Sequence, residues 1–144
     1  MHELTFVMLK PDALERGLIG EIVGRLERKG LRPKRFLWRA FTKEMAKKHY
    51  AHLVGKKFYP ELEAYITRGP VLGSVWEGRD AIEVVRILVG NTDPAKAAAG
   101  TIRGDLAIDE TENLVHASDS PEAVRREVEI FFGDLLPEMK MKFY

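Results

Sequence analysis

Cysteine is absent from this sequence. Its absence excludes disulfides, thiolate zinc sites and cysteine nucleophiles. Long apolar runs are also absent, since no stretch approaches the roughly 18 to 20 residues that a membrane-spanning helix needs. The first residues carry neither the basic nor the apolar region of a signal peptide. We therefore expect no membrane partner and a cytoplasmic location.

A large excess of charge of either sign is missing too. The 144 residues include 23 basic and 22 acidic side chains, which gives a formal net charge of +1. This balance argues against a surface dedicated to nucleic acid, although a local basic cleft is compatible with it. There is no Walker sequence, and Gly17–Gly20 matches neither a P-loop nor a dinucleotide fingerprint. With no internal repeat or linker, the length predicts one globular domain over residues 1–144.

Short apolar runs and helical periodicity alternate along the chain. The apolar or aromatic runs predict four strands, at residues 4–9, 35–41, 71–76 and 114–117. Amphipathic spacing, caps and breakers predict helices at residues 19–29, 43–53, 61–66 and 80–89, and a last one that begins at Pro121. Residues 95–112 have weak periodicity, and we expect an irregular segment there that suits an anion-binding loop.

This order of elements predicts an α+β fold of the ferredoxin-like βαββαβ type. We expect a four-stranded antiparallel sheet with the helices packed on one face. The other face would then need cover, which favours oligomerisation. The tail from Pro137 to Tyr144 has no periodicity, and we expect it to pack on the surface or on a neighbouring subunit.

The clearest chemical signal is the segment Asn113–Ser120. His116 ends a short apolar run there, and Pro121 opens a helix behind it. Neutral imidazole is the side chain best suited to attack a phosphate near pH 7, so our hypothesis is that His116 is a nucleophile. Glu127, eleven residues further on, could accept a hydrogen bond from one ring nitrogen and orient the ring. The alternatives, a structural histidine and a solvated helix glutamate, stay open at this point.

Cations and small polar groups stand at element ends and in the irregular segment. Arginine gives forked donation and lysine a compact charge, so such a set could hold a polyphosphate. Phosphoryl transfer needs mainly in-line positioning and charge neutralisation. The candidates for this role are Lys10, Arg86, Thr92, Arg103 and Asn113.

Two ring-bearing features admit both a structural and a functional interpretation. His49 and His52 have the i, i+3 spacing of a metal pair, but we interpret them as partly exposed histidines on a basic helix, since no third ligand stands near them in the sequence. Phe58 precedes a helix, where rings usually join the core, but at a cleft mouth it could stack on a base. We therefore expect no metal site built by the protein itself.

A series of motifs in the same order resembles the nucleoside diphosphate kinase family over essentially the whole chain. The matching stretches are Leu9–Asp12, Arg16–Ile22, His49–Tyr50, Gly69–Val71, Val75–Gly78, Thr92–Pro94, Gly100–Asp105 and Asn113–Ser120. The resemblance implies the ferredoxin-like fold and transfer of the γ-phosphate of a nucleoside triphosphate, mainly ATP, to a (deoxy)nucleoside diphosphate. It also implies a ping-pong cycle through a phosphohistidine, which by the motif is His116.

The same resemblance implies roles for the other candidates. Phosphate contacts would come from Lys10, Arg86, Thr92 and Arg103. Asn113 would contact the sugar, Phe58 would stack on the base, and Tyr50, Ser118 and Glu127 would support the histidine. Mg²⁺ would arrive on the nucleotide phosphates. Family members form hexamers or tetramers, so a homo-oligomer is implied as well.

Three positions depart from the family pattern. Ala117 stands where glycine usually follows the histidine, and a methyl group there would crowd the backbone if the position needs a positive φ. Ala99 replaces the usual proline before Gly100, which would loosen that loop. Glu110 replaces an aliphatic residue against the base and would weaken or change base contact. None of the three removes a residue that the chemistry requires.

Two other functions are compatible with parts of the sequence. A ferredoxin-like sheet can bind RNA through surface aromatics, but the near-zero charge and the irregular segment around Arg103 count against it. A catalytically silent homologue could act as an interaction protein. It would be expected to have lost His116 or the phosphate cations, and both are present.

Overall fold

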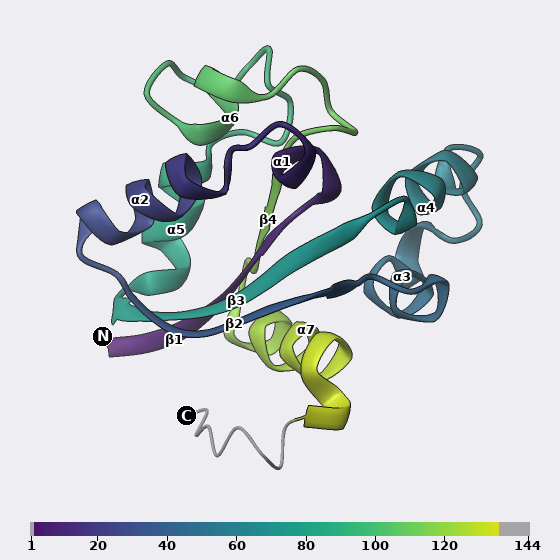
Figure 1. The fold of residues 1–144 in the computed structure, drawn as a ribbon, viewed down its shortest axis with the longest axis horizontal. Helices are drawn as coiled ribbons and strands as arrows, with labels where there is room; N and C mark the ends of the chain where they lie inside the picture. Colours follow the sequence, from purple (N-terminus) through teal and green to yellow (C-terminus); the bar gives the residue numbers. More distant parts are fainter. Residues whose placement is uncertain (1, 136–144) are drawn as a thin grey trace.

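The computed structural model describes residues 2–135 of the chain. One antiparallel sheet runs through the molecule in the order β2-β3-β1-β4 (Figure 1). Its strands are β1 (His2–Leu9), β2 (Arg32–Ala40), β3 (Pro70–Arg79) and β4 (Val115–Ala117). With helices connecting β1 to β2 and β3 to β4, this order is the ferredoxin-like arrangement, and the predicted fold class is confirmed.

Helices fill the connections between the strands. They are α1 (Pro11–Glu15), α2 (Ile19–Lys29), α3 (Lys43–His49), η1 (Ala51–Leu53), α4 (Tyr59–Thr67), α5 (Ala81–Val89), α6 (Ile102–Leu106), α7 (Pro121–Phe132) and η2 (Gly133–Leu135). Their ends follow local chemistry. Gly30 ends α2 with a φ of +106°, where glycine carries no Cβ penalty, and the Ser120 hydroxyl accepts from the Ala123 amide to cap α7.

Helices cover both faces of the sheet, so the expectation of one covered face was wrong. Alternate residues of β1 point to opposite sides because a strand has a period of two. Phe6 and Met8 join a core with residues of α4 and α7, whereas Val7 and Leu9 join a second core with α2 and α5. In Figure 1, α7 lies on one side of the sheet and α2 and α5 on the other. The chain itself therefore covers the face that we expected to invite a partner.

The irregular regions contain more structure than the sequence indicated. The segment predicted as one helix over 43–53 is divided, with α3 ending at His49 and η1 following it. Helix α1 follows β1 directly, where only a strand end was predicted. Helix α6 forms inside the segment 95–112, with Thr101 as its N-cap. The tail from Pro137 lies outside the described residues.

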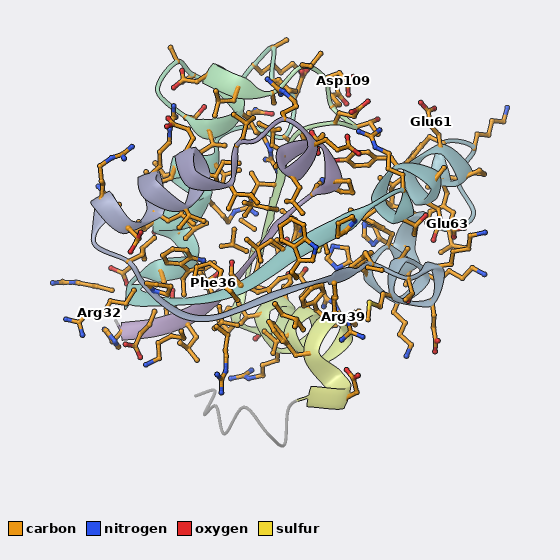
Figure 2. The ribbon with its side chains drawn as sticks, in the orientation of Figure 1. Arg32, Phe36, Arg39, Glu61, Glu63 and Asp109 are labelled. Carbon is orange, nitrogen blue, oxygen red and sulfur yellow. The ribbon has the colours of Figure 1, made fainter. Side chains whose placement is uncertain are left out.

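Strand β2 forms an edge of the sheet and is its most exposed strand. Pro33 lies within it, at a shift in the pairing with β3, which is tolerated because an edge strand needs fewer ladder hydrogen bonds. Phe36 and Trp38 are 45% and 55% exposed and lie on one face, two residues apart. Figure 2 shows Phe36 and Arg39 along this strand.

Candidate active site

A cleft of 480 Å³ lies where the end of β1, the segment after α5, helix α6 and strand β4 meet. These elements are far apart in the sequence, and the antiparallel pairing of β1 with β4 brings them together, with Met8 opposite His116. The lining residues are Lys10, Tyr50, Arg86, Val89, Gly90, Asn91, Thr92, Arg103, Asn113, His116, Ala117 and Asp119. The cleft is therefore rich in cations and contains a single carboxylate, Asp119.

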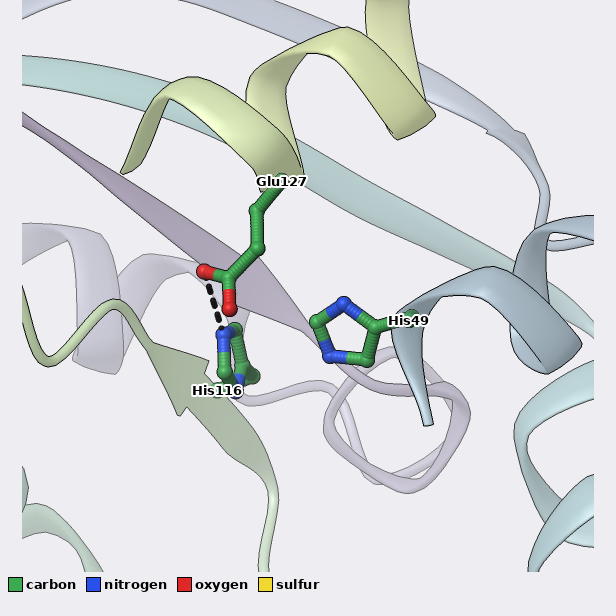
Figure 3. A group of neighbouring side chains, drawn as sticks. All are labelled: His49, His116 and Glu127. Carbon is green, nitrogen blue, oxygen red and sulfur yellow. Dashed lines mark hydrogen bonds and ion pairs between the residues drawn. The ribbon is translucent and has the colours of Figure 1, made fainter. Parts of the chain in front are cut away.

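His116 is fixed on its inner side by Glu127, as the family resemblance implied. Its Nε2 lies 2.8 Å from Glu127 Oε1 (Figure 3). The Ser118 hydroxyl donates to the same oxygen at 2.5 Å. Burial raises the pKa of Glu127, but the hydrogen bonds from His116 and Ser118 outweigh it and hold that pKa below its ordinary value. Glu127 is thus a carboxylate that accepts, and in the neutral His116 ring the proton is on Nε2 and the lone pair is on Nδ1.

His49 lies beside this pair, which the sequence did not indicate. It is 9% exposed, so the prediction of a partly exposed histidine was wrong. Its ring stands nearly perpendicular to that of His116, with 4.6 Å between the ring centroids (Figure 3). Burial, followed by the neighbouring His116, lowers the pKa of His49 to about 3, so this imidazole is neutral at pH 7. His52, by contrast, lies in η1 and is exposed.

Two of the cleft's cations, Lys10 and Arg103, are buried, at 7% and 8% exposure. Burial and the charge of Arg103 lower the pKa of Lys10 to about 8, although Asp12 raises it. Burial and the charge of Arg86 lower the pKa of Arg103 to about 10. Within residues 2–135 none of these three cations forms an ion pair. The cleft therefore concentrates positive charge, and a bound anion would reduce the repulsion between these cations.

Backbone carbonyls hold the Arg103 guanidinium in place. It donates to Asn113 O at 3.3 Å, Gly90 O at 3.0 Å and Val115 O at 2.6 Å. Lys10 Nζ donates to Asn113 Oδ1 at 2.8 Å. The Asn113 amide donates in turn to the carbonyls of Thr92 and Glu110. Asn113 is thus hydrogen-bonded both to Lys10 and to the two segments that contain Thr92 and Glu110.

Most residues predicted for the site meet in this cleft. Six of the seven line it: Lys10, Arg86, Thr92, Arg103, Asn113 and His116. Phe58 does not; it precedes α4 and is 52% exposed. Tyr50 lines the cleft, and its hydroxyl is buried without a hydrogen-bond partner among the described residues. Gly90 and Asn91 also line the cleft, and the sequence analysis did not identify them as site residues. Their position just after a helix was the only feature of the sequence that could have indicated this role.

The three departures from the family pattern have different structural outcomes. Ala117 has no positive φ, so its methyl group causes no backbone strain. The loop after Ala99 is held by Asp105, which accepts from the Gly100 amide and pairs with Arg25. Glu110 is exposed and lines a neighbouring cavity of 590 Å³ between α4 and residues 109–112. Ala117 and Glu110 therefore both lie on surfaces that a ligand could meet, Ala117 in the cleft and Glu110 in the neighbouring cavity.

One group of side chains has the composition of a metal site. His49, His116 and Glu127 offer ligand atoms that all lie within 4.8 Å of one another (Figure 3). Two imidazoles and a carboxylate are a ligand set that zinc accepts. Two of these three side chains, His116 and Glu127, are already hydrogen-bonded to each other, so their position has an explanation that needs no metal.

An imidazole that a carboxylate orients lies next to cations that form no ion pair among residues 2–135, and these are parts that phosphoryl transfer can use. Comparison with known proteins agrees. The nucleoside diphosphate kinase profile matches residues 3–135. The nucleoside diphosphate kinase of Archaeoglobus fulgidus is 56% identical over 134 residues, which is 92% of this chain and 87% of that protein. That of Ignicoccus hospitalis is 52% identical over 132 residues, or 92% of this chain and 90% of that protein.

Solved structures give the same result. The halophilic nucleoside diphosphate kinase of Halobacterium salinarum, solved in complex with CDP, has a TM-score of 0.88 and 48% identity, covering 92% of this chain and 88% of that one. The apo enzyme of Encephalitozoon cuniculi has a TM-score of 0.89 and 39% identity, covering 92% and 90%. This chain therefore belongs to the nucleoside diphosphate kinase family, and it is a phosphotransferase.

Proposed function

We propose that His116 is the residue through which this enzyme passes the γ-phosphate of a nucleoside triphosphate to a nucleoside diphosphate. In the first half-reaction His116 Nδ1 forms a bond to the γ-phosphorus. The bond from that phosphorus to the bridging oxygen breaks, and its electron pair stays with the departing diphosphate. In the second half-reaction a β-phosphate oxygen of another diphosphate attacks the same phosphorus, and the electron pair returns to Nδ1.

The orientation of the His116 ring supports Nδ1 as the attacking atom. Glu127 accepts from Nε2 at 2.8 Å, which leaves the lone pair on the other nitrogen. The side chain of Glu127 is only 7% exposed, so water competes little for this contact, whereas that of His116 is 23% exposed and reaches the cleft. When Nδ1 gains phosphorus, the ring becomes more positive, and the carboxylate stabilises the Nε2–H that remains.

The single observation that carries the proposal is the group of cations facing this histidine. Lys10, Arg86 and Arg103 line the same cleft, and burial and mutual repulsion lower the pKa values of two of them. A bound anion would stabilise the charged forms of these side chains. A triphosphate supplies the missing negative charge, and the fixed guanidinium of Arg103 would hold it in line with Nδ1.

The remaining contacts are assigned by the same reasoning. Thr92 would contact a phosphate and Asn113 the sugar, and the exposed ring of Phe58 would stack on the base outside the cleft. The cleft offers one carboxylate, Asp119, which is too few for a dedicated magnesium cage. Mg²⁺ would therefore arrive as part of the substrate, bound to the nucleotide phosphates.

We also propose that residues 1–144 act as one cytoplasmic domain and assemble as a hexamer or tetramer. No helix among residues 2–135 is long and apolar enough to cross a bilayer. The exposed rings Phe36 and Trp38 on β2 form an apolar patch that a second copy could cover. Sedimentation of the wild type and of Trp38→Glu would test this: a smaller particle for the variant is expected, and a wild-type monomer would contradict the assembly.

The catalytic assignment is tested by labelling with γ-labelled ATP. We expect label that is labile to acid and stable to base, that is lost on addition of unlabelled diphosphate, and that is absent from His116→Ala. His52→Ala is a matched control, because it removes an exposed histidine of the same chain. Label that persisted in His116→Ala would refute the role of His116, and no label on the wild type would refute the reaction.

A further inference from the structure

The residue before β4 has an uncommon backbone conformation. Leu114 has a φ of +74°, a region that a bulky side chain rarely adopts, although it is fully buried. The Val115 amide donates to Asn113 O at 2.9 Å, across this one residue. Asn113–Val115 is thus a γ-turn with a positive φ at its centre, which is a rare and strained form. Such a conformation persists only where its surroundings hold it.

The turn contains one residue of the proposed site and directly precedes another. Asn113 begins the turn and lines the cleft, and His116 follows immediately after Val115. A change of φ at Leu114 would rotate Asn113 relative to β4. Both side chains would then no longer face the same ligand. The geometry of this one residue therefore decides whether the two side chains act together.

Asp12 is the side chain that holds the Leu114 amide. Its Oδ2 accepts from Leu114 N at 3.1 Å, and Asp12 is 2% exposed. Its Oδ1 accepts from the hydroxyl of Tyr65, which is 4% exposed. Asp12 therefore bonds to α4 through one carboxylate oxygen and to the turn through the other. The Lys10 amide adds a second hydrogen bond to the turn, donating to Leu114 O at 2.8 Å.

We propose that Asp12 is a positioning residue, which holds the Asn113–Val115 turn so that Asn113 and His116 face the same nucleotide. The inference rests on the proposed function. Asp12 acts through hydrogen-bond acceptance and does not touch the substrate. Tyr65 keeps the carboxylate in the orientation that the turn needs.

Asp12→Ala and Asp12→Asn separate this role from a general structural one. Alanine removes the acceptor for the Leu114 amide. Asparagine keeps an oxygen that can accept from it, while its amide group can donate to the Tyr65 hydroxyl oxygen. We expect Asp12→Ala to slow single-turnover phosphorylation of His116 about 100-fold, since a misplacement of about 1 Å costs that much, and Asp12→Asn to stay within about tenfold of the wild type.

Glu15→Ala is the matched control, because it removes a carboxylate of the same short helix that bonds to Arg68 and not to a residue of the turn. It should stay within about twofold of the wild type. Hydrogen–deuterium exchange of residues 113–117 gives a second readout. Protection should be lost in Asp12→Ala and kept in Asp12→Asn and Glu15→Ala. If Asp12→Ala does not fold, Tyr65→Phe replaces it, with an expected slowing of about tenfold and faster exchange in the same segment.

Three results would overturn the proposal. The first is a normal phosphorylation rate in Asp12→Ala, or in Tyr65→Phe where that variant is used. The second is equal slowing in Asp12→Ala and Glu15→Ala. The third is slowing in Asp12→Asn as severe as in Asp12→Ala with residues 113–117 still protected, which would assign the effect to the charge of Asp12 near Lys10. A wild type that takes no label would instead refute the proposed function and is thereby distinguished from all three.

Discussion

The buried lysine of the cleft makes the pH dependence of this enzyme unusual on its alkaline side. Burial and Arg103 lower the pKa of Lys10 from 10.5 to about 8. Its charged fraction therefore falls from about 0.9 at pH 7 to about 0.1 at pH 9. If Lys10 neutralises the phosphates, kcat/KM for ATP should fall about tenfold over this range, because kcat/KM reports the free enzyme. The value of kcat should fall less, since a bound triphosphate raises the pKa of the lysine.

Stability should change in the opposite direction over the same range. The folded-state pKa of Lys10 lies below the unfolded value, so between pH 8 and 10.5 the unfolded chain holds the proton and the folded chain does not. Unfolding free energy therefore rises with pH in this window. From pH 8 to 9.5 the contribution of Lys10 is about 2 kcal/mol, at about 1.4 kcal/mol per pH unit.

The assay is direct chromatographic measurement of ADP formed at each pH, with chemical denaturation of the same samples. Lys10→Ala should be slow and should show no break near pH 8. Lys96→Ala is a control, because it removes an exposed lysine from the loop beside the cleft. A break near pH 8 that persisted in Lys10→Ala would refute the assignment, as would a kcat/KM that stayed constant from pH 7 to pH 9.5 in the wild type.

Three further predictions follow from other parts of the molecule. Arg103→Ala should cost the transition state on the order of 2 to 4 kcal/mol, or about 30- to 1000-fold in phosphorylation rate, and an unchanged rate would remove Arg103 from the site. The pKa of His49 is lowered to about 3, so the unfolded chain binds a proton at this residue before the folded chain does, and the unfolding free energy should fall by on the order of 4 kcal/mol between pH 6.5 and pH 3. Denaturant titrations of His49→Phe should show a smaller fall over the same pH range. A Cβ at Gly73 would lie 2.2 Å from Phe131 Cε2, so Gly73→Ala should destabilise the fold by about 1 to 3 kcal/mol, and an unchanged melting temperature would contradict that packing.

The parts of the fold that follow from local sequence pattern could be predicted. Periodicity placed α2 and α5, and the Ser120-Pro121 pair placed the start of α7. The second covered face could not be predicted in this way. A strand such as β1 that is buried on both sides gives a continuous apolar run, and that run does not say which helix lies on which side.

The site shows the same division between local and tertiary information. The position of His116 and the cations near element ends were visible as motifs. Spacing left the contact with Glu127 open, and the family resemblance implied it. The burial of His49 was not predicted, because its neighbours His116 and Glu127 are more than sixty residues away in the sequence. The strained turn at Leu114 was hidden as well, since glycine or asparagine, the usual signal for a positive φ, is absent at that position.

The position of the phosphoryl group on the imidazole tests the central claim most directly. The protein is phosphorylated with ATP, freed of nucleotide and analysed by phosphorus and nitrogen NMR after proteolysis in base. Because Nε2 contacts Glu127 and the lone pair is left on Nδ1, we expect one phosphoryl group, bonded to Nδ1 of His116. Phosphorus on Nε2 of that ring, or on any other residue, would contradict the account.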